Sequence, residues 1–455
     1  MNHHFIKKEG NRQLILVFGG WSVGKEFYSD LCFPEWDTLL VNGYSDSDFD
    51  PNLLAEYDSV ALFAWSLGVF MASRLITDEN VCMAVAINGT EFPLSDNYGI
   101  PEKIFIGTAE NLSTASLTKF QKRMAGKRFN EVSDVLNELS DIDSLRNELL
   151  YIKNRFSESK SEKTNPLHWT RSYVYSDDLI FPAEVQKNFW SVFHPSTEVI
   201  SAEGSHLPDL KQIIGSIIVD RKKIGDKFQN ALPDYDDNAV IQQKIAEKLA
   251  MMAPDVRCEK IVEIGHGSGL FSRLITERLH PESVDFIDLY PVSPFGFAKN
   301  ERYIVADAEK WVGEQAENTS EVYDAIVSSS AIQWFYDPAR FLKNCHKLLK
   351  PGGFLLFSTF SPENFKELRR LNPFPMLYHS QEEYLAILDK YFQKVVSESE
   401  TVNLDFPTHR HLLRHIISTG AGATGKRTAL SDEKQGDKIK SLTYSPLYFL
   451  AVKEG

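Results

Sequence analysis

The stretch Val60-Ala61-Leu62-Phe63-Ala64-Trp65-Ser66-Leu67-Gly68 decides the fold of the first half of this chain. Its first five residues are apolar and predict a buried strand, and the apolar residues after Gly68 predict the helix that follows. Small residues stand two places before and two places after Ser66, as a strained turn between a strand and a helix requires. Ala64 replaces the usual glycine but keeps this steric condition. The turn predicts a nucleophilic serine or, more simply, a helix N-cap.

A second stretch, Glu263-Ile264-Gly265-His266-Gly267-Ser268-Gly269, decides the fold of the second half. Lys260 to Ile264 predicts a strand, and Leu270 to Leu279 predicts the helix that the glycine loop opens. Glycines let a ligand approach the backbone, and a carboxylate at the strand end repels phosphate but attracts a cationic amino group. The loop therefore favours S-adenosylmethionine over a dinucleotide.

Two carboxylates follow the loop in the order of a nucleotide site. Asp288 ends a predicted strand that starts at Val284, about twenty residues on, where a doubly wound fold binds ribose hydroxyls. Asp307 then stands where the adenine amino group is commonly bound. The alternative is a Rossmann-like turn with surface acids that bind nothing.

Composition excludes several classes of protein. The length of 455 residues fits two domains with separate cores, and no apolar run approaches the roughly 20 residues of a membrane helix. The run LILVF near the N-terminus is too short for a signal-peptide core, and four scattered cysteines without a CxxC pair indicate neither zinc nor disulfides. A net charge of -14 argues against nonspecific nucleic-acid binding. We expect a cytoplasmic enzyme without a metal, a membrane or a nucleic-acid partner.

The first half also supplies an acid and a histidine after the serine, in the chain order of hydrolases with a catalytic triad. Asp178 lies in a turn after a predicted strand, and Asp177 beside it is a rival for the same role. His206 follows in a Gly-Ser-His loop. His168 and His194 are nearby in the sequence and are expected to be structural.

Between Thr108 and Asn165 the sequence changes to a charged, amphipathic helical stretch, in which Leu136, Leu139, Leu145 and Leu149 recur at helical intervals. We expect a lid here. The segment Lys119 to Arg128 is the most basic decapeptide of the chain. A solvated helix face is its simpler interpretation, and a docking surface for an acidic partner protein is the alternative.

The junction and the second half give further expectations. Ile213 to Asp220 predicts the last helix of the first domain, and Arg221 to Asp226 a short polar bridge. The glycine-rich segment Gly420 to Gly425 predicts a mobile substrate cover. The other expected elements are a helix from Tyr235 to Ala250, a strand from Tyr323 to Ser328, a helix that starts at Ala331, a turn from Leu348 to Gly353 and a strand from Phe354 to Thr359.

With Phe18-Gly19-Gly20-Trp21 and Trp65-Ser66-Leu67-Gly68, residues 10 to 215 resemble the pimeloyl-[acyl-carrier protein] methyl ester esterases, which are α/β-hydrolases of biotin synthesis. The resemblance implies that Ser66 is the nucleophile, His206 the general base and then acid, and Asp178 the group that orients the imidazole. It also implies an oxyanion hole formed by the amides of Trp21 and Leu67.

The second half resembles the class I methyltransferases and is similar to the malonyl-[acyl-carrier protein] O-methyltransferases. The similarity rests on YDxxAxxQ from Tyr235, SxxAIQW from Ser328 and FSTF from Phe357. Asn238 and His266 depart from the usual His and Cys. Gln333 and Trp334 are expected to face the substrate, and ordinary core packing is the alternative for Trp334. Four arginines are candidates for the substrate carboxylate: Arg369, Arg370, Arg410 and Arg414. The implied S-adenosylmethionine contacts are Tyr235, Glu263, Gly265, Gly267, Gly269, Asp288, Asp307 and Ser328.

Together these features predict an α/β protein of two domains: an α/β-hydrolase at residues 1–220, with a lid at about 108–165, and a Rossmann-like methyltransferase at 225–455. The resemblances imply a bifunctional enzyme that methylates malonyl groups and hydrolyses methyl pimeloyl esters, both on acyl carrier protein. Two alternatives stay open. One is a general carboxylesterase or thioesterase fused to an unrelated small-molecule methyltransferase. The other is a noncatalytic half that presents its partner half to the carrier protein.

Overall fold

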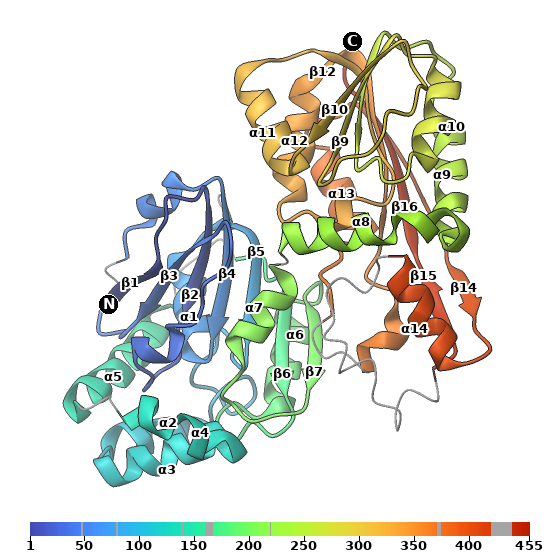
Figure 1. Ribbon diagram of the computed structural model, residues 1–455. Helices are drawn as coiled ribbons and strands as arrows, with labels where there is room; N and C mark the ends of the chain where they lie inside the picture. Colours follow the sequence, from blue (N-terminus) through green and yellow to red (C-terminus); the bar gives the residue numbers. More distant parts are fainter. Residues whose placement is uncertain are drawn as a thin grey trace. The chain divides into compact units, whose positions relative to one another are not determined.

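The computed structural model describes residues 1–46, 49–78, 81–137, 141–159, 167–218, 220–370, 375–419 and 439–455. The chain divides into two compact units, Met1–Gly215 and Ser216–Gly455 (Figure 1). Each unit is built around its own seven-stranded sheet. No helix of the described ranges combines the length and apolarity that spanning a bilayer requires.

The first unit holds a sheet with the strand order β1-β3-β2-β4-β5-β6-β7. Only β1 runs antiparallel to its neighbour; the other pairs are parallel. The central strands β2 and β4 are mostly apolar and almost completely buried, as parallel strands covered on both faces must be. The edge strand β1 is polar and half-exposed, so its sequence contains no apolar pattern from which a strand could be predicted. The strands are β1 (Asn2–Lys7), β2 (Gln13–Phe18), β3 (Asp37–Asn42), β4 (Ser59–Trp65), β5 (Val81–Ile87), β6 (Arg171–Tyr175) and β7 (Glu198–Ala202).

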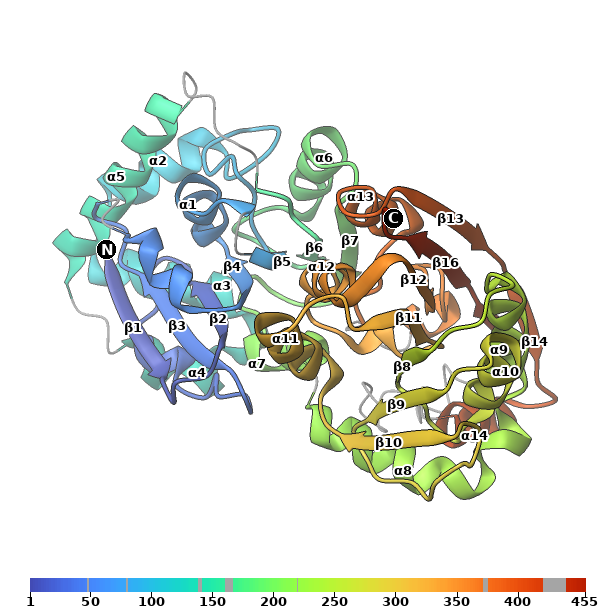
Figure 2. The ribbon, with the colours of Figure 1, turned by 90° about the horizontal axis from the view of Figure 1, so that it is seen from above.

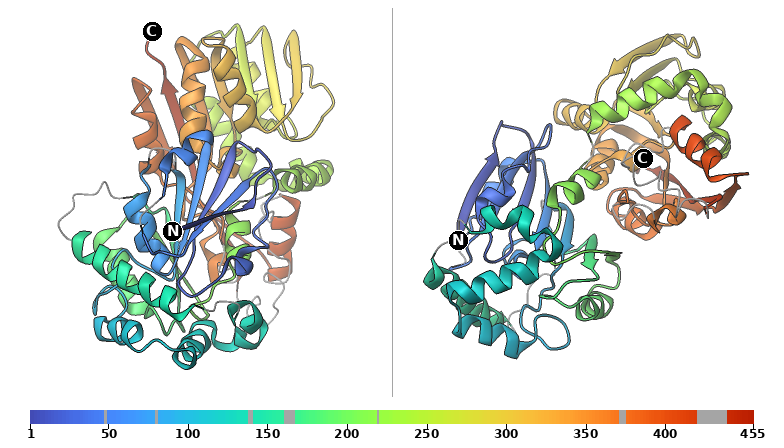
Figure 3. Two further views of the ribbon diagram at one scale, coloured as in Figure 1. Left: turned by 90° about the vertical axis from the view of Figure 1, so that its left-hand side faces the viewer. Right: turned by 60° about the horizontal axis from the view of Figure 1, so that its bottom comes forward.

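Helices cover both faces of this sheet. Helix α1 (Leu67–Leu75) starts directly after Ser66 and lies on the face opposite α7 (Leu210–Ile217), while α6 (Ala183–Phe193) packs beside β6 (Figure 2). Four more helices gather at one end of the sheet (Figure 3). They are α2 (Glu102–Glu110), α3 (Thr114–Ala125), α4 (Phe129–Asn137) and α5 (Ile142–Ser159). This helical region starts six residues before the predicted limit, at Glu102, and Leu139 and residues 160–166 lie outside the described ranges.

The second unit holds a sheet with the order β10-β9-β8-β11-β12-β16-β13, in which β16 alone runs antiparallel to its neighbours. The strand order reverses between β8 and β11, which creates the crevice where doubly wound folds bind ligands. The strands are β8 (Lys260–Ile264), β9 (Ser283–Asp288), β10 (Asn300–Val305), β11 (Tyr323–Ser328), β12 (Leu349–Phe360), β13 (Lys394–Ser399) and β16 (Pro446–Val452). A separate pair is formed by β14 (Val402–Asp405) and β15 (Ser441–Tyr444).

Helices α9 (Val240–Met252) and α10 (Leu270–Leu279) lie on one face of this sheet, and α11 (Ala308–Asn318) and α12 (Pro338–Leu348) on the other (Figure 2). Helix α13 (Gln381–Leu388) packs beside β13 and α12, and α14 (His409–Ser418) packs beside α8 (Arg221–Asn238).

Three predictions at the junction and behind β11 were wrong. The expected polar bridge is the first part of α8, because Asp220 caps the backbone amide of Lys223 and apolar residues recur at helical spacing from Ile224. The preceding helix α7 ends at Ile217, before the predicted limit. The helix expected from Ala331 is one turn of 3-10 helix, because the chain starts a new helix at Pro338 with Asp337 as its N-cap.

Candidate active sites

The turn at Ser66 has the strained geometry that its sequence predicts. Ser66 adopts φ 60° and ψ −126°, a backbone conformation that residues other than glycine rarely adopt. A Cβ atom on Gly68 would lie 2.5 Å from the carbonyl oxygen of Phe18, and one on Gly89 would lie 2.4 Å from the carbonyl oxygen of Ser66. Glycine is therefore required for steric reasons two residues after the serine and at Gly89, which follows the neighbouring strand β5.

The structure brings together the serine, the histidine and one of the two candidate acids. His206 Nε2 lies 2.8 Å from Ser66 Oγ, and His206 Nδ1 lies 2.8 Å from Asp178 Oδ2. All three side chains are buried. Asp177 is exposed, and its carboxylate accepts a hydrogen bond from Ser176. The geometry therefore favours Asp178 as the partner of the histidine.

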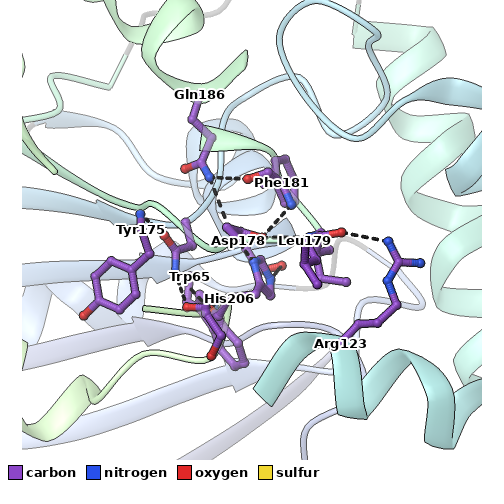
Figure 4. A network of polar contacts seen from close by, with 12 residues as sticks. Trp65, Arg123, Tyr175, Asp178, Leu179, Phe181, Gln186 and His206 are labelled. Atoms are coloured by element: carbon purple, nitrogen blue, oxygen red, sulfur yellow. Dashed lines mark hydrogen bonds and ion pairs between the residues drawn. The ribbon is translucent and has the colours of Figure 1, made fainter. Parts of the chain in front are cut away.

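A second layer of hydrogen bonds fixes the acid (Figure 4). Asp178 Oδ1 accepts from the amides of Ile180 and Phe181, each at 2.8 Å, and Oδ2 accepts from Gln186 Nε2 at 3.2 Å. The same Gln186 nitrogen donates to the carbonyl oxygen of Phe181 at 2.6 Å. These donors fix the orientation of the Asp178 carboxylate toward His206.

The histidine is held through its backbone. Its carbonyl oxygen accepts from Trp65 Nε1 and from Asn88 Nδ2, each at 3.0 Å. Asn88 Oδ1 in turn accepts from the amide of Tyr175. The sequence analysis missed Gln186 and Asn88, because a single polar residue in a helix or after a strand carries no local signal of a buried role.

The predicted oxyanion-hole residues Trp21 and Leu67 line the same pocket as Ser66. Leu67 opens helix α1, where backbone amides have no acceptor within the helix. The turn before Trp21 is fixed, because the amide of Gly20 donates to Tyr28 Oη at 3.0 Å and Trp21 Nε1 donates to Leu145 of α5 at 3.0 Å. Apart from Thr108 and Arg123, the rest of the lining is apolar: Ile100, Ile104, Phe105, Phe120, Leu149, Leu179 and Ile180.

The second unit has a large pocket at the carboxyl ends of its strands, where the strand order reverses. Five of the eight predicted cofactor residues line it: Tyr235, Gly265, Gly267, Asp288 and Asp307. A Cβ atom on Gly267 would meet no atom within 4 Å, so the loop leaves open space at that position. The pocket thus matches the predicted loop and both predicted carboxylates.

The other three predicted residues have different positions. Gly269 adopts φ 87° at the start of α10, and a Cβ atom there would lie 2.8 Å from the ring of Phe295. Ser328 Oγ donates to the carbonyl oxygen of Ile264 at 2.9 Å, while Ser329 and Ser330 line the pocket instead. Glu263 is completely buried at the end of β8.

The carboxyl groups in and next to this pocket fit S-adenosylmethionine: Asp288 lines it, and Glu263 lies buried at the start of the glycine loop. Neither carboxylate oxygen of Glu263 has a hydrogen-bond partner among the described residues. Burial raises the pKa of Glu263 to about 8. Asp288 accepts from the amides of Gly267 at 2.9 Å and Leu289 at 2.7 Å, and burial raises its pKa. Buried carboxyl groups of this kind gain from a cationic ligand, which the amino and sulfonium groups of the cofactor provide.

The sequence analysis missed Arg221, which it placed in the expected bridge. Arg221 is buried, lines the pocket and lies 3.3 Å from Asp307 Oδ2. It also forms an ion pair with Glu309 and donates to the carbonyl oxygen of Trp334. Glu309 accepts from the amide of Tyr336 at 2.9 Å, and burial raises its pKa to about 7 although Arg221 opposes this. Arg221 therefore joins α8 to α11 and to the segment after β11.

The arginines proposed for a substrate carboxylate lie elsewhere. Arg410 and Arg414 are exposed on α14, and neither they nor Arg369 line the pockets described above or the one beside the cofactor pocket. The side chain of Arg370 and the predicted cover Gly420 to Gly425 lie outside the described residues. Within the described ranges, no three His, Cys, Asp or Glu side chains are grouped to hold a metal ion.

Known proteins match both units. Residues 1–208 match the family model described as pimeloyl-ACP methyl esterase BioG, and residues 238–395 match a methyltransferase-domain model. A protein of Bacteroides fragilis (strain 638R) named malonyl-[acyl-carrier protein] O-methyltransferase is 31% identical over 97% of this chain and 93% of its own length. A Porphyromonas gingivalis protein of the same name is 32% identical over 51% of this chain and 96% of its own.

A solved structure is similar to the first unit. The crystal structure of BioG from Haemophilus influenzae is 30% identical in sequence, and the match covers 45% of this chain and 94% of that one, with a TM-score of 0.41. The two family models place the esterase domain before the methyltransferase domain. The chain therefore belongs to the malonyl-[acyl-carrier protein] O-methyltransferase family and carries a pimeloyl-ACP methyl esterase BioG domain before its methyltransferase domain.

Proposed function

We propose that this protein is a bifunctional enzyme of biotin precursor synthesis that methylates the free carboxyl of malonyl-ACP and hydrolyses the methyl ester of pimeloyl-ACP. The observation that carries this proposal is the pair of sites on one chain. His206 lies 2.8 Å from both Ser66 and Asp178 beside an apolar pocket, and the other unit holds a glycine-loop pocket lined by the partly buried carboxylates of Asp288 and Asp307. We propose the α/β-hydrolase fold for the first unit on the same geometry.

The triad supports serine esterase chemistry. With a proton on Nδ1 facing Asp178, His206 Nε2 can accept the proton of Ser66 as Oγ bonds to the ester carbonyl carbon. The amides of Trp21 and Leu67 would stabilise the negative oxygen that forms, an effect worth about 3 kcal/mol per donor. His206 then gives this proton to the leaving methoxide oxygen, and methanol departs. In the second step His206 takes a proton from a water molecule as the water attacks the acyl carbon, and returns it to Ser66 Oγ as the acyl group is released.

The methyltransferase unit needs little acid or base chemistry. Bound S-adenosylmethionine would supply an activated methyl group on its sulfonium, and a carboxylate is already a nucleophile. The protein must bind, align and exclude water. We assign Glu263, at the start of the glycine loop, to the amino group of the cofactor. Asp288 is assigned to the ribose hydroxyls and Asp307 to the adenine. Tyr235 and Arg221 of α8 form a wall of the pocket.

The two reactions oppose each other, so the proposal requires that their substrates differ in length. Methylation masks the charged end of the malonyl group, chain extension adds methylenes, and hydrolysis removes the mask at the pimeloyl stage. The apolar wall beside Ser66 suits the longer chain, and each methylene buried there contributes about 0.8 kcal/mol.

An acidic carrier protein also has a candidate docking surface. Lys119, Lys122 and Lys127 are exposed on and just after α3, in a protein whose net charge is -14. Arg123 on the same helix lines the pocket at Ser66. A local basic surface would steer an acidic carrier to this pocket despite the overall negative charge.

The direct test follows the mass of the carrier protein. Purified wild type, Ser66→Ala and Gly267→Arg are incubated with malonyl-ACP and S-adenosylmethionine, and separately with methyl pimeloyl-ACP. We expect methyl gain to fail only in the glycine variant and methyl loss to fail only in the serine variant. If wild type performs neither reaction, the substrate assignment is wrong.

A further inference from the structure

A second pocket adjoins the cofactor pocket in the methyltransferase unit. Four residues line both: Phe228 and Tyr235 of α8, and Ser330 and Trp334 after β11. The remaining wall comes from α9, from the end of β12 and the segment after it, and from α14 and β15. A methyl group can leave the cofactor pocket through this shared wall.

The second pocket combines an apolar wall with several polar side chains and carries no charge on its described lining. Its polar side chains include Gln242, Gln333, Asn364, Tyr378 and Tyr444, and neither a lysine nor an arginine is among the described residues that line it. Arg369, Arg410 and Arg414, which the sequence offered for a carboxylate, are not among the described residues of this wall.

Three polar atoms at this pocket have no hydrogen-bond partner among the described residues, although all are buried. They are Ser330 Oγ, Gln333 Oε1 and Gln242 Oε1. The amide nitrogen of Gln333 donates one hydrogen to the carbonyl oxygen of Ser330, which leaves its second hydrogen for another acceptor. Ser330 itself adopts φ 55°, a conformation rare for serine and typical of functional sites. A carboxylate only accepts hydrogen bonds, so the Ser330 hydroxyl and the second hydrogen of Gln333 can bind it, whereas the two amide oxygens require a donor.

Electrostatics favour neutral donors for this particular acceptor. Transfer of a methyl group from a sulfonium to a carboxylate converts two charged reactants into a neutral thioether and a neutral ester. An arginine paired with the carboxylate would stabilise the charged reactants more than the transition state, in which the charges are disappearing, and would slow the reaction. Neutral donors orient the carboxylate without neutralising it, so its negative charge remains available to attract the sulfonium.

We propose that the second pocket is the acceptor site of the methyltransferase, and that the Gln333 amide and the Ser330 hydroxyl bind the malonyl carboxylate in place of an arginine. This inference rests on the proposed function. In the reaction, one carboxylate oxygen bonds to the methyl carbon as the carbon–sulfur bond breaks, and no proton moves. Phe228, Trp334, Phe360 and Phe365 exclude water around the reacting atoms.

The test compares Gln333→Glu and Ser330→Ala with Arg410→Ala and Arg414→Ala, all in the Ser66→Ala chain so that no ester is hydrolysed. Loss of a hydrogen bond to a charged group predicts a KM for malonyl-ACP that rises at least tenfold in the first pair. Gln333→Glu should have the larger effect because it adds a repelling charge. Binding of S-adenosylhomocysteine to Gln333→Glu, measured by calorimetry, should stay within threefold of the parent.

A second readout separates carboxylate recognition from general damage. The neutral product, methyl malonyl-ACP, should inhibit Gln333→Glu as well as it inhibits the parent, because it lacks the carboxylate. An unchanged KM in Gln333→Glu, or a tenfold rise in Arg410→Ala or Arg414→Ala, would overturn the neutral site and leave the proposed function intact. If the Ser66→Ala parent binds S-adenosylhomocysteine but does not methylate malonyl-ACP, the proposed function is wrong and the inference fails with it.

Discussion

The difference between Asp177 and Asp178 shows how a single residue gains its role. Two adjacent aspartates are equivalent in composition, but the turn after β6 exposes one and buries the other against His206. We expect Asp178→Asn to lower kcat for methyl pimeloyl-ACP by about 10³ to 10⁴, because the histidine loses its orienting carboxylate. Asp177→Asn is the matched control and should stay within twofold of wild type. Equal losses in both variants would contradict the assignment.

Glu263 gives a prediction with a defined pH dependence. Its folded pKa, about 8, exceeds the ordinary value of 4.5, so the folded protein without cofactor binds the proton more tightly than the unfolded chain. The buried carboxyl therefore costs increasing stability as pH rises from about 4.5 to 8. Glu263→Gln removes this cost and should stabilise the cofactor-free unit by up to about 5 kcal/mol at pH 8.5, with no gain near pH 4.5.

The same variant should bind the cofactor less well. We expect S-adenosylhomocysteine to raise the melting temperature less in Glu263→Gln than in wild type, because the cationic amino group of the ligand loses its counter-charge. Scanning calorimetry at pH 5, 7 and 8.5, with and without the ligand, measures both effects. A variant that is less stable than wild type at pH 8.5 without ligand would show that the carboxylate is satisfied in the cofactor-free protein.

Residues within motifs could be predicted from the sequence, and residues that act through tertiary contacts could not. Ser66, His206, Gly267 and Asp288 stand at strand ends or in glycine loops, where the local pattern restricts their surroundings. Gln186 and Asn88 gain their roles only when the ends of several strands meet. The hydroxyl of Ser328 was assigned to the cofactor from its motif, but it bonds to β8, and its two neighbours line the pocket.

At the scale of elements, the sequence predicted the strand β8, the glycine loop and the helix α10 correctly, but it did not predict the start of α8. A strand, a glycine loop and a helix are coded by consecutive residues, and both predicted ranges agree with the structure. The start of α8 is strongly basic, so the pattern of the sequence indicated a solvated bridge. Its burial depends on Glu309 and Asp307, which are far away in the sequence.

Helix α8 should therefore depend on one buried ion pair. Arg221→Ala leaves Glu309 without its cation, and breaking a buried pair in this way costs about 3 to 5 kcal/mol. We expect a lower melting temperature of the methyltransferase unit and weaker binding of S-adenosylhomocysteine, while hydrolysis at Ser66 is unchanged. Adding Glu309→Gln should restore most of the stability. A double variant as unstable as the single one would show that the charge pair does not hold the helix.

The basic helix α3 can be tested in the same way. Lys119→Glu, Lys122→Glu and Lys127→Glu together should raise the KM for methyl pimeloyl-ACP about tenfold at low salt, with a smaller effect as salt is added. Hydrolysis of a small, uncharged carrier-free ester should not change. Lys187→Glu, an exposed lysine on α6, is the control. If the triple variant hydrolyses the carrier-bound ester like wild type, α3 is a solvated face.

At the scale of the whole molecule, two opposed activities on one chain are useful only if the esterase ignores the product of the methyltransferase. The pocket beside Ser66 offers its apolar wall to a chain long enough to reach it, and a methyl malonyl group lacks the four additional methylenes of methyl pimeloyl. At about 0.8 kcal/mol for each buried methylene, full burial corresponds to roughly 200-fold in kcat/KM.

Wild type incubated with malonyl-ACP and S-adenosylmethionine should therefore accumulate methyl malonyl-ACP, because methylation outpaces hydrolysis of the short ester. Methyl pimeloyl-ACP added to the same mixture should lose its methyl group while the short ester persists, as carrier mass measured over time would show. Replacing Ile104 or Leu149 in the pocket wall by alanine should reduce this discrimination, because the long chain loses contacts that the short chain does not make. Equal rates of hydrolysis for the two esters in wild type would mean that methylation and hydrolysis cancel, and that the two units do not serve one pathway on a common carrier.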